Sequence, residues 1–256
     1  MPKHVLEARG LTLSWDGDHV VAKDISLTVD PGEILCLVGR SGCGKSTILH
    51  ALSGLSQPMA GQVFLHGEDI TGVPGRVSYM LQKDLLLPSL RVIDNACLPL
   101  TIAGTPREEA RARAHELLGQ FGLEGVEDRW PAELSGGMRQ RVAFLRTYLM
   151  GNDCVLLDEP FSALDAFTRV RLRAWFCATA RDLGLAVVAI THDVDEAVNM
   201  ADRVKVLEGT PSAGVPSVLT AEVVPARPVG MSDDAFALTE GFLAAKRTVL
   251  AALGEV

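Results

Sequence analysis

The sequence predicts an α/β fold with a mostly parallel core sheet, and the alternation of strand-like and helix-like segments carries this prediction. Apolar runs of strand length lie at residues 34–38, 154–157 and 186–190, and a further strand is expected at 203–207. Segments of helix length lie between them, at residues 45–55, 168–183 and 194–200. Strands joined by crossover helices in this order form a parallel sheet. The continuously apolar run at 34–38 is typical of a strand that is buried on both faces.

The N-terminal segments have a different pattern, which predicts antiparallel strands. Residues 5–9 and 24–29 alternate between apolar and polar side chains, as half-exposed strands do. Residues 30–33, Asp-Pro-Gly-Glu, favour a turn before the buried run. We therefore expect an antiparallel β-subdomain beside the parallel core.

Residues 90–150 interrupt the alternation and predict a helical subdomain, inserted at about 88–150. We expect one helix at 90–103 and a second at 106–121. Thr105 suits the N-cap of the second helix, and Pro106 suits its first turn because an amide hydrogen there would have no helical partner.

The chain changes character beyond residue 208. We expect a main domain at 1–208 and a C-terminal extension at 209–256. Small residues favour a loop at 209–214, and prolines favour a further break at 225–228.

The last part of the extension predicts an amphipathic helix at 233–253. Its expected apolar side comprises Phe236, Phe242, Leu243, Val249 and Leu250. The sequence gives no indication of what this helix does.

Composition restricts the class of function. The 256 residues are 48% hydrophobic and 22% charged, which is ordinary for a soluble globular protein. The net charge of −8 argues against nucleic acid as the main partner and against broad binding to anionic lipid. The five cysteines are scattered, with no Cys-x-x-Cys pair, which favours buried free thiols in a reducing compartment. Neither a signal peptide nor a membrane-spanning run is evident, so we expect a cytoplasmic chain.

A phosphate-binding loop is the first motif that carries chemistry. Residues 39–47, Gly-Arg-Ser-Gly-Cys-Gly-Lys-Ser-Thr, match G-x-x-x-x-G-K-[ST] between a predicted strand and a helix. The glycines let backbone N–H groups converge on one point, and the helix N-terminus adds a positive dipole. Lys45 offers a mobile charge to the β- and γ-phosphates, and Ser46 offers a hydroxyl to Mg²⁺. The expected nucleotide-binding residues are Gly39, Ser41, Gly42, Cys43, Gly44, Lys45, Ser46 and Thr47.

An acidic pair follows the predicted strand at 154–157. The strand end lies near the phosphate loop. We therefore expect Asp158 to bind Mg²⁺ through water and Glu159 to position or deprotonate the attacking water. A bare acidic pair would more often cap a strand, so the residues that follow, 160–165, decide between the two interpretations.

Residues 134–141, Leu-Ser-Gly-Gly-Met-Arg-Gln-Arg, open an amphipathic helical run. In a chain that also has a phosphate loop, they resemble the signature motif of ATP-binding cassette (ABC) ATPases. Residues 160–165 resemble the D-loop of that family, which favours the catalytic interpretation of the acidic pair. The motifs run in the family's order from Trp15 to Asp202, so the resemblance implies the P-loop NTPase fold of ABC ATPases for most of the chain.

The resemblance implies roles for further residues. Gln82 matches the Q-loop glutamine that touches Mg²⁺ or its water, and His192 matches the switch histidine that contacts the γ-phosphate. Trp15 aligns with the aromatic residue that stacks on adenine, and a tryptophan packed at a strand end is the alternative. The signature and the D-loop would complete the ATP site of a second copy, through Ser135, Gly136, Gly137 and Asp165.

The cofactors that the resemblance implies are ATP and Mg²⁺. The catalytic residues would be Glu159, His192 and Gln82. The metal-binding residues would be Ser46, Gln82 and Asp158.

Residues 81–88, 92–95 and 135–141 resemble, more narrowly, the nitrate/sulfonate/taurine class of bacterial importers. That class uses two ATPase subunits, two membrane permease subunits and a periplasmic solute-binding protein. The resemblance therefore implies a head-to-tail homodimer that ATP closes, held at the inner face of the membrane by the permease. Residues 85–87, three leucines, are expected to meet the permease, and a place in the local core is the alternative.

Two other functions remain open. A non-transport ABC ATPase that acts on nucleic acid or the ribosome would share these motifs. The interval between Gln82 and Ser135 is too short for the long coiled coil of some such proteins, and the acidic charge also disfavours them. A small-molecule kinase with a phosphate loop would leave the signature motif unexplained.

Overall fold

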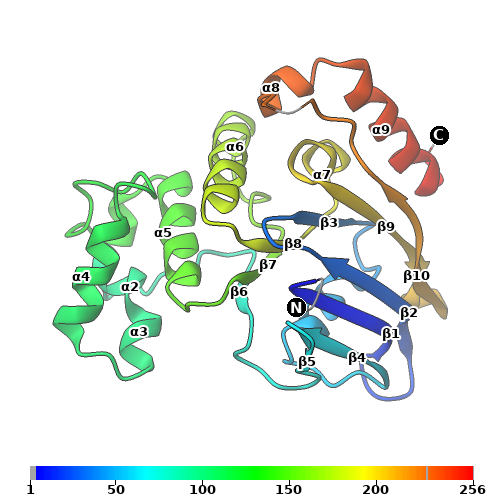
Figure 1. Cartoon of the computed structure of the whole chain (residues 1–256), viewed down its shortest axis with the longest axis horizontal. Helices are drawn as coiled ribbons and strands as arrows, with labels where there is room; N and C mark the ends of the chain where they lie inside the picture. Colours follow the sequence, from blue (N-terminus) through cyan, green and yellow to red (C-terminus); the bar gives the residue numbers. More distant parts are fainter. Residues whose placement is uncertain (1–3, 229, 256) are drawn as a thin grey trace.

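The computed structural model describes residues 4–228 and 230–255 and shows an α/β fold built on a ten-stranded sheet (Figure 1). The strand order is β5-β4-β1-β2-β10-β9-β3-β8-β7-β6. The strands are β1 (Leu6–Ser14), β2 (Val20–Val29), β3 (Ile34–Val38), β4 (Ala60–Leu65), β5 (Glu68–Asp69), β6 (Ser78–Met80), β7 (Cys154–Asp158), β8 (Ala186–Thr191), β9 (Arg203–Thr210) and β10 (Val215–Val223).

β3 lies at the centre of a parallel core, which confirms the predicted fold class. It pairs in parallel with β8 on one side and β9 on the other, and β7 and β6 extend the sheet in parallel. Ile34, Cys36 and Val38 belong to one hydrophobic cluster and Leu35 and Leu37 to another. Successive side chains of a strand point to opposite faces, so β3 joins the two halves of the core.

The antiparallel β-subdomain is also present. β1 pairs in antiparallel fashion with β2 and with β4, and β4 pairs with β5. Both long strands extend further than the alternating runs indicated, to Ser14 and back to Val20. A single parallel pairing, Ser217 with Ala22, connects this subdomain to the core through β10.

Helices cover both faces of the sheet. Helix α1 (Lys45–Leu52) buries Ile48 and Leu49 in the cluster that also contains the β-subdomain. α6 (Ala166–Asp182), α7 (Val194–Met200) and α9 (Glu240–Ala252) lie along the other side of the core strands (Figure 1). α1 ends earlier than residue 55, and Gly54, with φ 73°, adopts the left-handed conformation that follows many helices.

The helical subdomain lies to one side of the sheet, on the left in Figure 1, and packs on it through α5. Its helices are α2 (Val92–Ala96), α3 (Leu98–Ile102), α4 (Arg107–Leu117) and α5 (Gly136–Tyr148), with a 3₁₀ turn at Pro131–Glu133. Two short helices replace the single helix expected at 90–103, because Pro99 has no N–H with which to continue α2. Thr105 does not cap α4, whose N-cap position is occupied by Pro106.

The prediction of a loop at 209–214 is wrong. β9 continues to Thr210, a 3₁₀ turn follows at Pro211–Ala213, and β10 returns antiparallel to β9. A Cβ atom added to Gly209 would lie 2.4 Å from the Cα of Ser217, so glycine permits the close approach of the two strands. The small residues therefore mark a tight strand pair rather than the end of the sheet.

The single helix expected at 233–253 is also divided. α8 (Asp233–Phe236) is followed by α9, whose N-cap Thr239 accepts a hydrogen bond from the N–H of Phe242 at 3.2 Å. Phe236, Phe242 and Val249 are buried against α7 and the sheet. Leu243, expected on the apolar side, is exposed, because the break shifts the helix phase. Among the described residues, no helix has both the length and the apolar character needed to cross a membrane.

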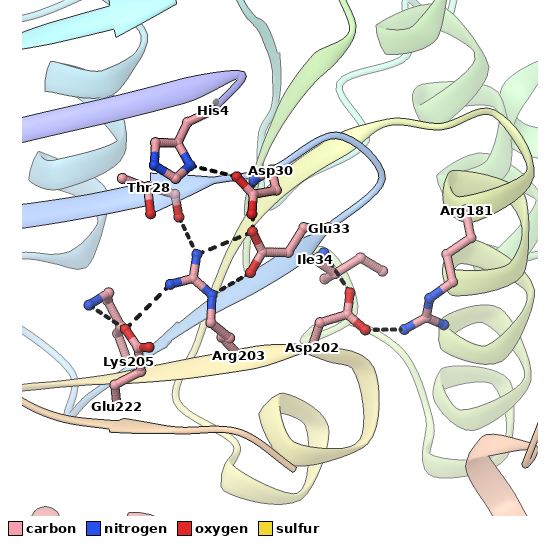
Figure 2. Close-up of polar contacts among 10 residues, drawn as sticks. All are labelled: His4, Thr28, Asp30, Glu33, Ile34, Arg181, Asp202, Arg203, Lys205 and Glu222. Atoms are coloured by element: carbon pink, nitrogen blue, oxygen red, sulfur yellow. Dashed lines mark hydrogen bonds and ion pairs between the residues drawn. The ribbon is translucent and has the colours of Figure 1, made fainter. Parts of the chain in front are cut away.

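Charged side chains tie the start of β9 to the β2–β3 turn (Figure 2). Arg203 forms a two-nitrogen ion pair with Glu33, and this contact raises the pKa of Arg203. Asp202 accepts the N–H of Ile34 at 2.9 Å and a guanidinium N–H of Arg181 at 3.1 Å. The network therefore holds the beginnings of β3 and β9 together. The phosphate loop lies at the other end of β3, after Val38.

Candidate functional site

The phosphate loop connects β3 to α1, and its glycines are required by its geometry. Gly42 and Gly44 have φ of 79° and 95°. An added Cβ would lie 2.5 Å from the Leu207 carbonyl oxygen at Gly39 and 2.6 Å from Val21 Cγ1 at Gly44. Larger side chains are therefore disfavoured at these positions, and the first backbone N–H groups of α1 have no partner within the helix, which suits an anion.

Lys45 lies on the inner side of this loop. Its side chain is only 5% exposed, and Nζ donates to the carbonyl oxygens of Gly39 at 2.7 Å and Arg40 at 3.0 Å. Cys43 is buried, and burial raises the pKa of its thiol. Ser41 and Ser46 are exposed, and Thr47 is half-buried. The loop therefore holds an ammonium group at its centre and hydroxyl groups at its surface.

Asp158 is placed beside the phosphate loop by the end of β7. Its Oδ1 lies 3.4 Å from Ser46 Oγ, which donates to it. Its Oδ2 accepts the hydroxyl of Tyr79 at 3.2 Å, and burial, with the nearby carboxylate, raises the pKa of that tyrosine. Tyr79 was not identified from the sequence. Its position one residue before the end of β6, next to β7, is the only signal that could have indicated it.

Glu159 contacts both of the other residues expected to be catalytic. His192 Nδ1 lies 3.0 Å from Glu159 Oε1, and Gln82 Nε2 donates to Glu159 Oε2 at 3.4 Å. Gln82 also donates to Ser162 Oγ at 3.1 Å, and no sequence motif indicates a role for this serine. The N–H of Glu159 donates to the carbonyl of Ile190. Residues from three separate chain segments thus converge at the carboxyl ends of β6, β7 and β8.

The backbone of Glu159 is strained. Its φ is 44°, in the left-handed region that residues other than glycine rarely adopt. Such conformations cluster at functional sites, where the surrounding contacts hold them in place. The contacts to Gln82, His192 and Ile190 serve this purpose here.

The signature residues lie on a second surface, where α5 meets the start of α6. Ser135 is the N-cap of α5 and accepts the N–H of Met138 at 3.3 Å. Asp165 caps α6 and accepts the N–H of Thr168 at 3.1 Å, and contacts with Thr168 hold the pKa of Asp165 below its usual value. An added Cβ would lie 3.1 Å from Leu164 at Gly136 and 3.0 Å from Thr168 at Gly137.

Trp15 lies in the turn between β1 and β2 and is 56% exposed. Its side chain is therefore available to a flat ligand rather than packed in the core. Val21, at the start of β2, packs on Gly44 of the phosphate loop. The connection between β1 and β2 therefore lies near the phosphate loop and carries the exposed indole of Trp15.

Comparison with known proteins identifies the family of this chain. Residues 22–162 match the family model described as ABC transporter. The chain belongs to the ABC transporter family. Its fold is also similar to that of the solved structure of cbiO1 from Clostridium perfringens, part of the ABC transporter complex cbiONQ. That likeness has a TM-score of 0.73 at 23% identity and covers 80% of this chain and 84% of the other.

The relatives of this ABC ATP-binding chain include importer subunits for several solutes. The Fe(3+) ions import ATP-binding protein FbpC 1 of Rhizobium meliloti is 42% identical over 75% of this chain and 55% of its own length. The nitrate import protein NrtC of Synechococcus elongatus is 39% identical over 81% of this chain and 32% of its own length. The chain thus spans about half or less of these two relatives.

A shorter relative matches over almost its whole length. The formylaminopyrimidine import ATP-binding protein ThiZ of Halalkalibacterium halodurans is 35% identical over 85% of each chain. In all three comparisons the matched part covers at least three quarters of this chain.

Proposed function

We propose that this chain binds ATP, hydrolyses it to ADP and phosphate, and thereby powers the import of a small solute through a separate membrane permease. The observation that carries the proposal is the convergence of Gln82 and His192 on Glu159, 3.4 and 3.0 Å from its two carboxylate oxygens. A phosphate loop of the required geometry lies beside it, joined through Ser46 and Asp158.

The residues beside the phosphate loop fit a Mg²⁺ ion. Mg²⁺ prefers oxygen ligands and keeps several of its waters. Ser46 Oγ and Asp158 Oδ1 are oxygen atoms 3.4 Å apart, and Gln82 lies at the same edge of the sheet. A bound Mg²⁺ would supply positive charge that stabilises the negative charge developing on the phosphoryl group. Ser46 would bind the ion, Asp158 would hold it through water, and Lys45 would contact the β- and γ-phosphates.

Glu159 would act on the attacking water. A carboxylate within hydrogen-bond distance of the water orients it and accepts its proton. His192 would hold Glu159 through their contact and touch the γ-phosphate, and Gln82 would reach toward the metal ion. Trp15 would stack on the adenine ring with its exposed indole. Phosphoryl transfer depends mainly on such positioning and on charge stabilisation.

The second surface is proposed to complete the ATP site of another copy. Ser135, Gly136 and Gly137 present the N-terminus of α5, which favours anions. Asp165 lies beside them at the start of α6. A head-to-tail, two-fold symmetric homodimer would place this surface over the phosphate loop of the partner. ATP would then stabilise the closed pair and hydrolysis would release it.

A groove between the sheet and the helical subdomain is the proposed permease surface. It has a volume of about 550 Å³, and its exposed apolar side chains are Leu81, Leu85, Ile102 and Met150. Leu87 is exposed nearby, whereas Leu86 is buried, so only part of the leucine cluster belongs to the local core. The occupant would be an apolar cytoplasmic segment of the permease. The chain would then be cytoplasmic and peripheral at the inner face of the membrane. A solute-binding protein would be an indirect partner, through the permease.

The solute class is proposed as nitrate, sulfonate or taurine. The aliphatic sulfonates import protein SsuB 1 of Xanthomonas axonopodis, another relative, is 43% identical over 76% of this chain and 78% of its own length. Specificity would reside in the permease and the binding protein. The residues described here would therefore supply the energy for transport without selecting the solute.

The test uses the purified full chain and then the whole transporter. The chain should release phosphate from ATP in the presence of Mg²⁺ and stop when EDTA is added. With its permease in vesicles, it should drive ATP-dependent uptake of nitrate, taurine or an alkanesulfonate. Failure to release phosphate, or co-purification with nucleic acid in place of a membrane protein, would refute the proposal.

A further inference from the structure

Residues 82–87, here called the Gln82 loop, are fastened to helix α5. Gln140 Nε2 donates to the carbonyl oxygen of Gln82 at 3.5 Å. Arg139 Nε donates to Asp84 Oδ2 at 3.1 Å. The loop that carries a catalytic side chain is therefore bound to the helix that carries the signature motif at its N-terminus.

Leu85, within this loop, has a strained backbone. Its φ is 44°, in the left-handed region that a leucine rarely adopts. Its side chain is exposed and lines the groove proposed for the permease. A residue in such a conformation needs contacts that hold it there.

Arg146 supplies those contacts. Its two terminal nitrogens donate to the carbonyl oxygens of Asp84, at 2.5 Å, and of Leu85, at 2.9 Å. One planar guanidinium thus bonds two consecutive carbonyls that lead into and out of the strained residue. The group is partly buried, and loss of solvent lowers the pKa of Arg146. The carbonyl bonds compensate for the water that this cation has lost.

The attachment runs along one face of the helix. Arg139 and Arg146 are seven residues apart, which is about two helical turns, so both face the loop. Ser135 caps the beginning of the same helix. A displacement of α5 would therefore move the Gln82 loop and the signature residues together.

We propose that Arg146 is a positioning residue that locks the Gln82 loop onto α5, so that Gln82, the groove-lining Leu85 and the signature serine move as one body. An arriving permease segment that presses on Leu85 would thereby shift both Gln82 in this copy and Ser135 toward the partner copy. This inference deepens the proposed function and rests on it for its consequence in catalysis. The attachment itself can be tested without any transport.

The test is amide hydrogen exchange in the isolated full chain carrying Arg146→Met. The N–H of Leu86 donates to Asp84 Oδ1 and that of Leu87 donates to Asn95 Oδ1, so both amides report on the order of the loop. We expect their exchange to accelerate roughly tenfold, while amides within α5 keep their rates. If Arg146→Met does not fold, Arg146→Lys serves, because an ammonium lacks the fork that spans both carbonyls.

Arg141→Met is the matched control. Arg141 is a partly buried arginine of the same helix, but its guanidinium lies over Trp175 at 4.5 Å and donates to the Phe121 carbonyl. Its loss should leave the exchange of Leu86 and Leu87 unchanged. Unchanged loop exchange in Arg146→Met, or an equal acceleration along the whole of α5, would overturn the proposal.

A second variant examines the strain directly. Glycine adopts the left-handed conformation without cost, so Leu85→Gly should reduce the effect of Arg146→Met on loop exchange. Equal effects in both backgrounds would contradict a role for Arg146 in holding Leu85.

Catalysis gives a separate readout. In a chain that hydrolyses ATP, Arg146→Met should lower kcat roughly tenfold with little change in the KM for ATP. A raised KM with unchanged kcat would overturn the positioning role. A wild-type chain without any ATPase activity would refute the proposed function, and the exchange measurements would still decide the attachment.

Discussion

His192 and Glu159 face each other across the ends of two neighbouring strands, with Nδ1 of the histidine 3.0 Å from Oε1 of the carboxylate. The β7–β8 register pairs Asp158 with Ile190. Glu159 directly follows the last residue of β7, and His192 directly follows the last residue of β8. The contact therefore depends on strand register as well as on residue type. A shift of one residue would turn either side chain to the other face of the sheet.

This contact predicts the effect of removing the histidine. His192→Ala should lower the rate of ATP hydrolysis by about 10²-fold, because Glu159 would lose the group that orients it. ATP binding, measured by a fluorescent nucleotide analogue, should change little. His66→Ala is the control, since His66 pairs with Asp153 at 2.9 Å on another part of the surface. Equal losses in the two variants would contradict the assignment.

Ser135 has two roles in this account, and one variant can separate them. Ser135→Arg should leave ATP binding to an isolated chain largely intact and block ATP-driven pairing, measured by analytical ultracentrifugation. It also removes the N-cap of α5, which costs about 1 kcal/mol of stability. Thr239→Ala removes the N-cap of α9 instead and should lower stability without affecting pairing. Normal dimerisation of Ser135→Arg would refute the proposed dimer surface.

The ion pair of Arg203 and Glu33 is expected to stabilise the fold. Their side chains are 22% and 11% exposed, so removal of one leaves a mostly buried charge without its partner. Arg203→Met should lower the free energy of unfolding by about 1–3 kcal/mol, measured by urea denaturation. Arg9→Met breaks the exposed pair with Glu7 and should have little effect. A comparable loss in both variants would argue against the importance of burial.

Glu196 predicts a pH-dependent effect. Burial raises its pKa above the ordinary value of 4.5, so the folded state binds its proton more tightly than the unfolded chain. Stability therefore falls as the pH rises from about 4.5 through the raised value. Glu196→Gln, which cannot ionise, should raise Tm at pH 8 by about 2–4 °C if the penalty is about 1 kcal/mol. The gain should vanish near pH 4, and a gain that is independent of pH would contradict this account.

The parallel core was predictable because a strand buried on both faces must be continuously apolar. β3 and β8 are of this kind, and all of their residues are buried. The phosphate loop was predictable for a similar reason, since its glycines are imposed by close contacts at Gly39 and Gly44. In both cases a local physical requirement restricts the residue types.

The C-terminal strand could not be predicted in the same way. β10 pairs with β2, which is distant in the sequence, and with β9 through a register that contains shifts. Only some of the side chains of β10 are buried. The break between α8 and α9 depends on the cap supplied by Thr239 rather than on hydrophobic period. The partners of the site residues, Tyr79 and Ser162, are common residue types whose role arises only from the folded geometry.

The central claim is that Glu159 activates the attacking water, and Glu159→Gln tests it most directly. The measurement is single-turnover ATP hydrolysis by the purified chain with Mg²⁺, with ATP binding recorded on the same sample and Glu208→Gln as control. We expect hydrolysis to fall by about 10³-fold or more while ATP still binds and the dimer accumulates. Hydrolysis near the wild-type rate, with ATP bound, would contradict it.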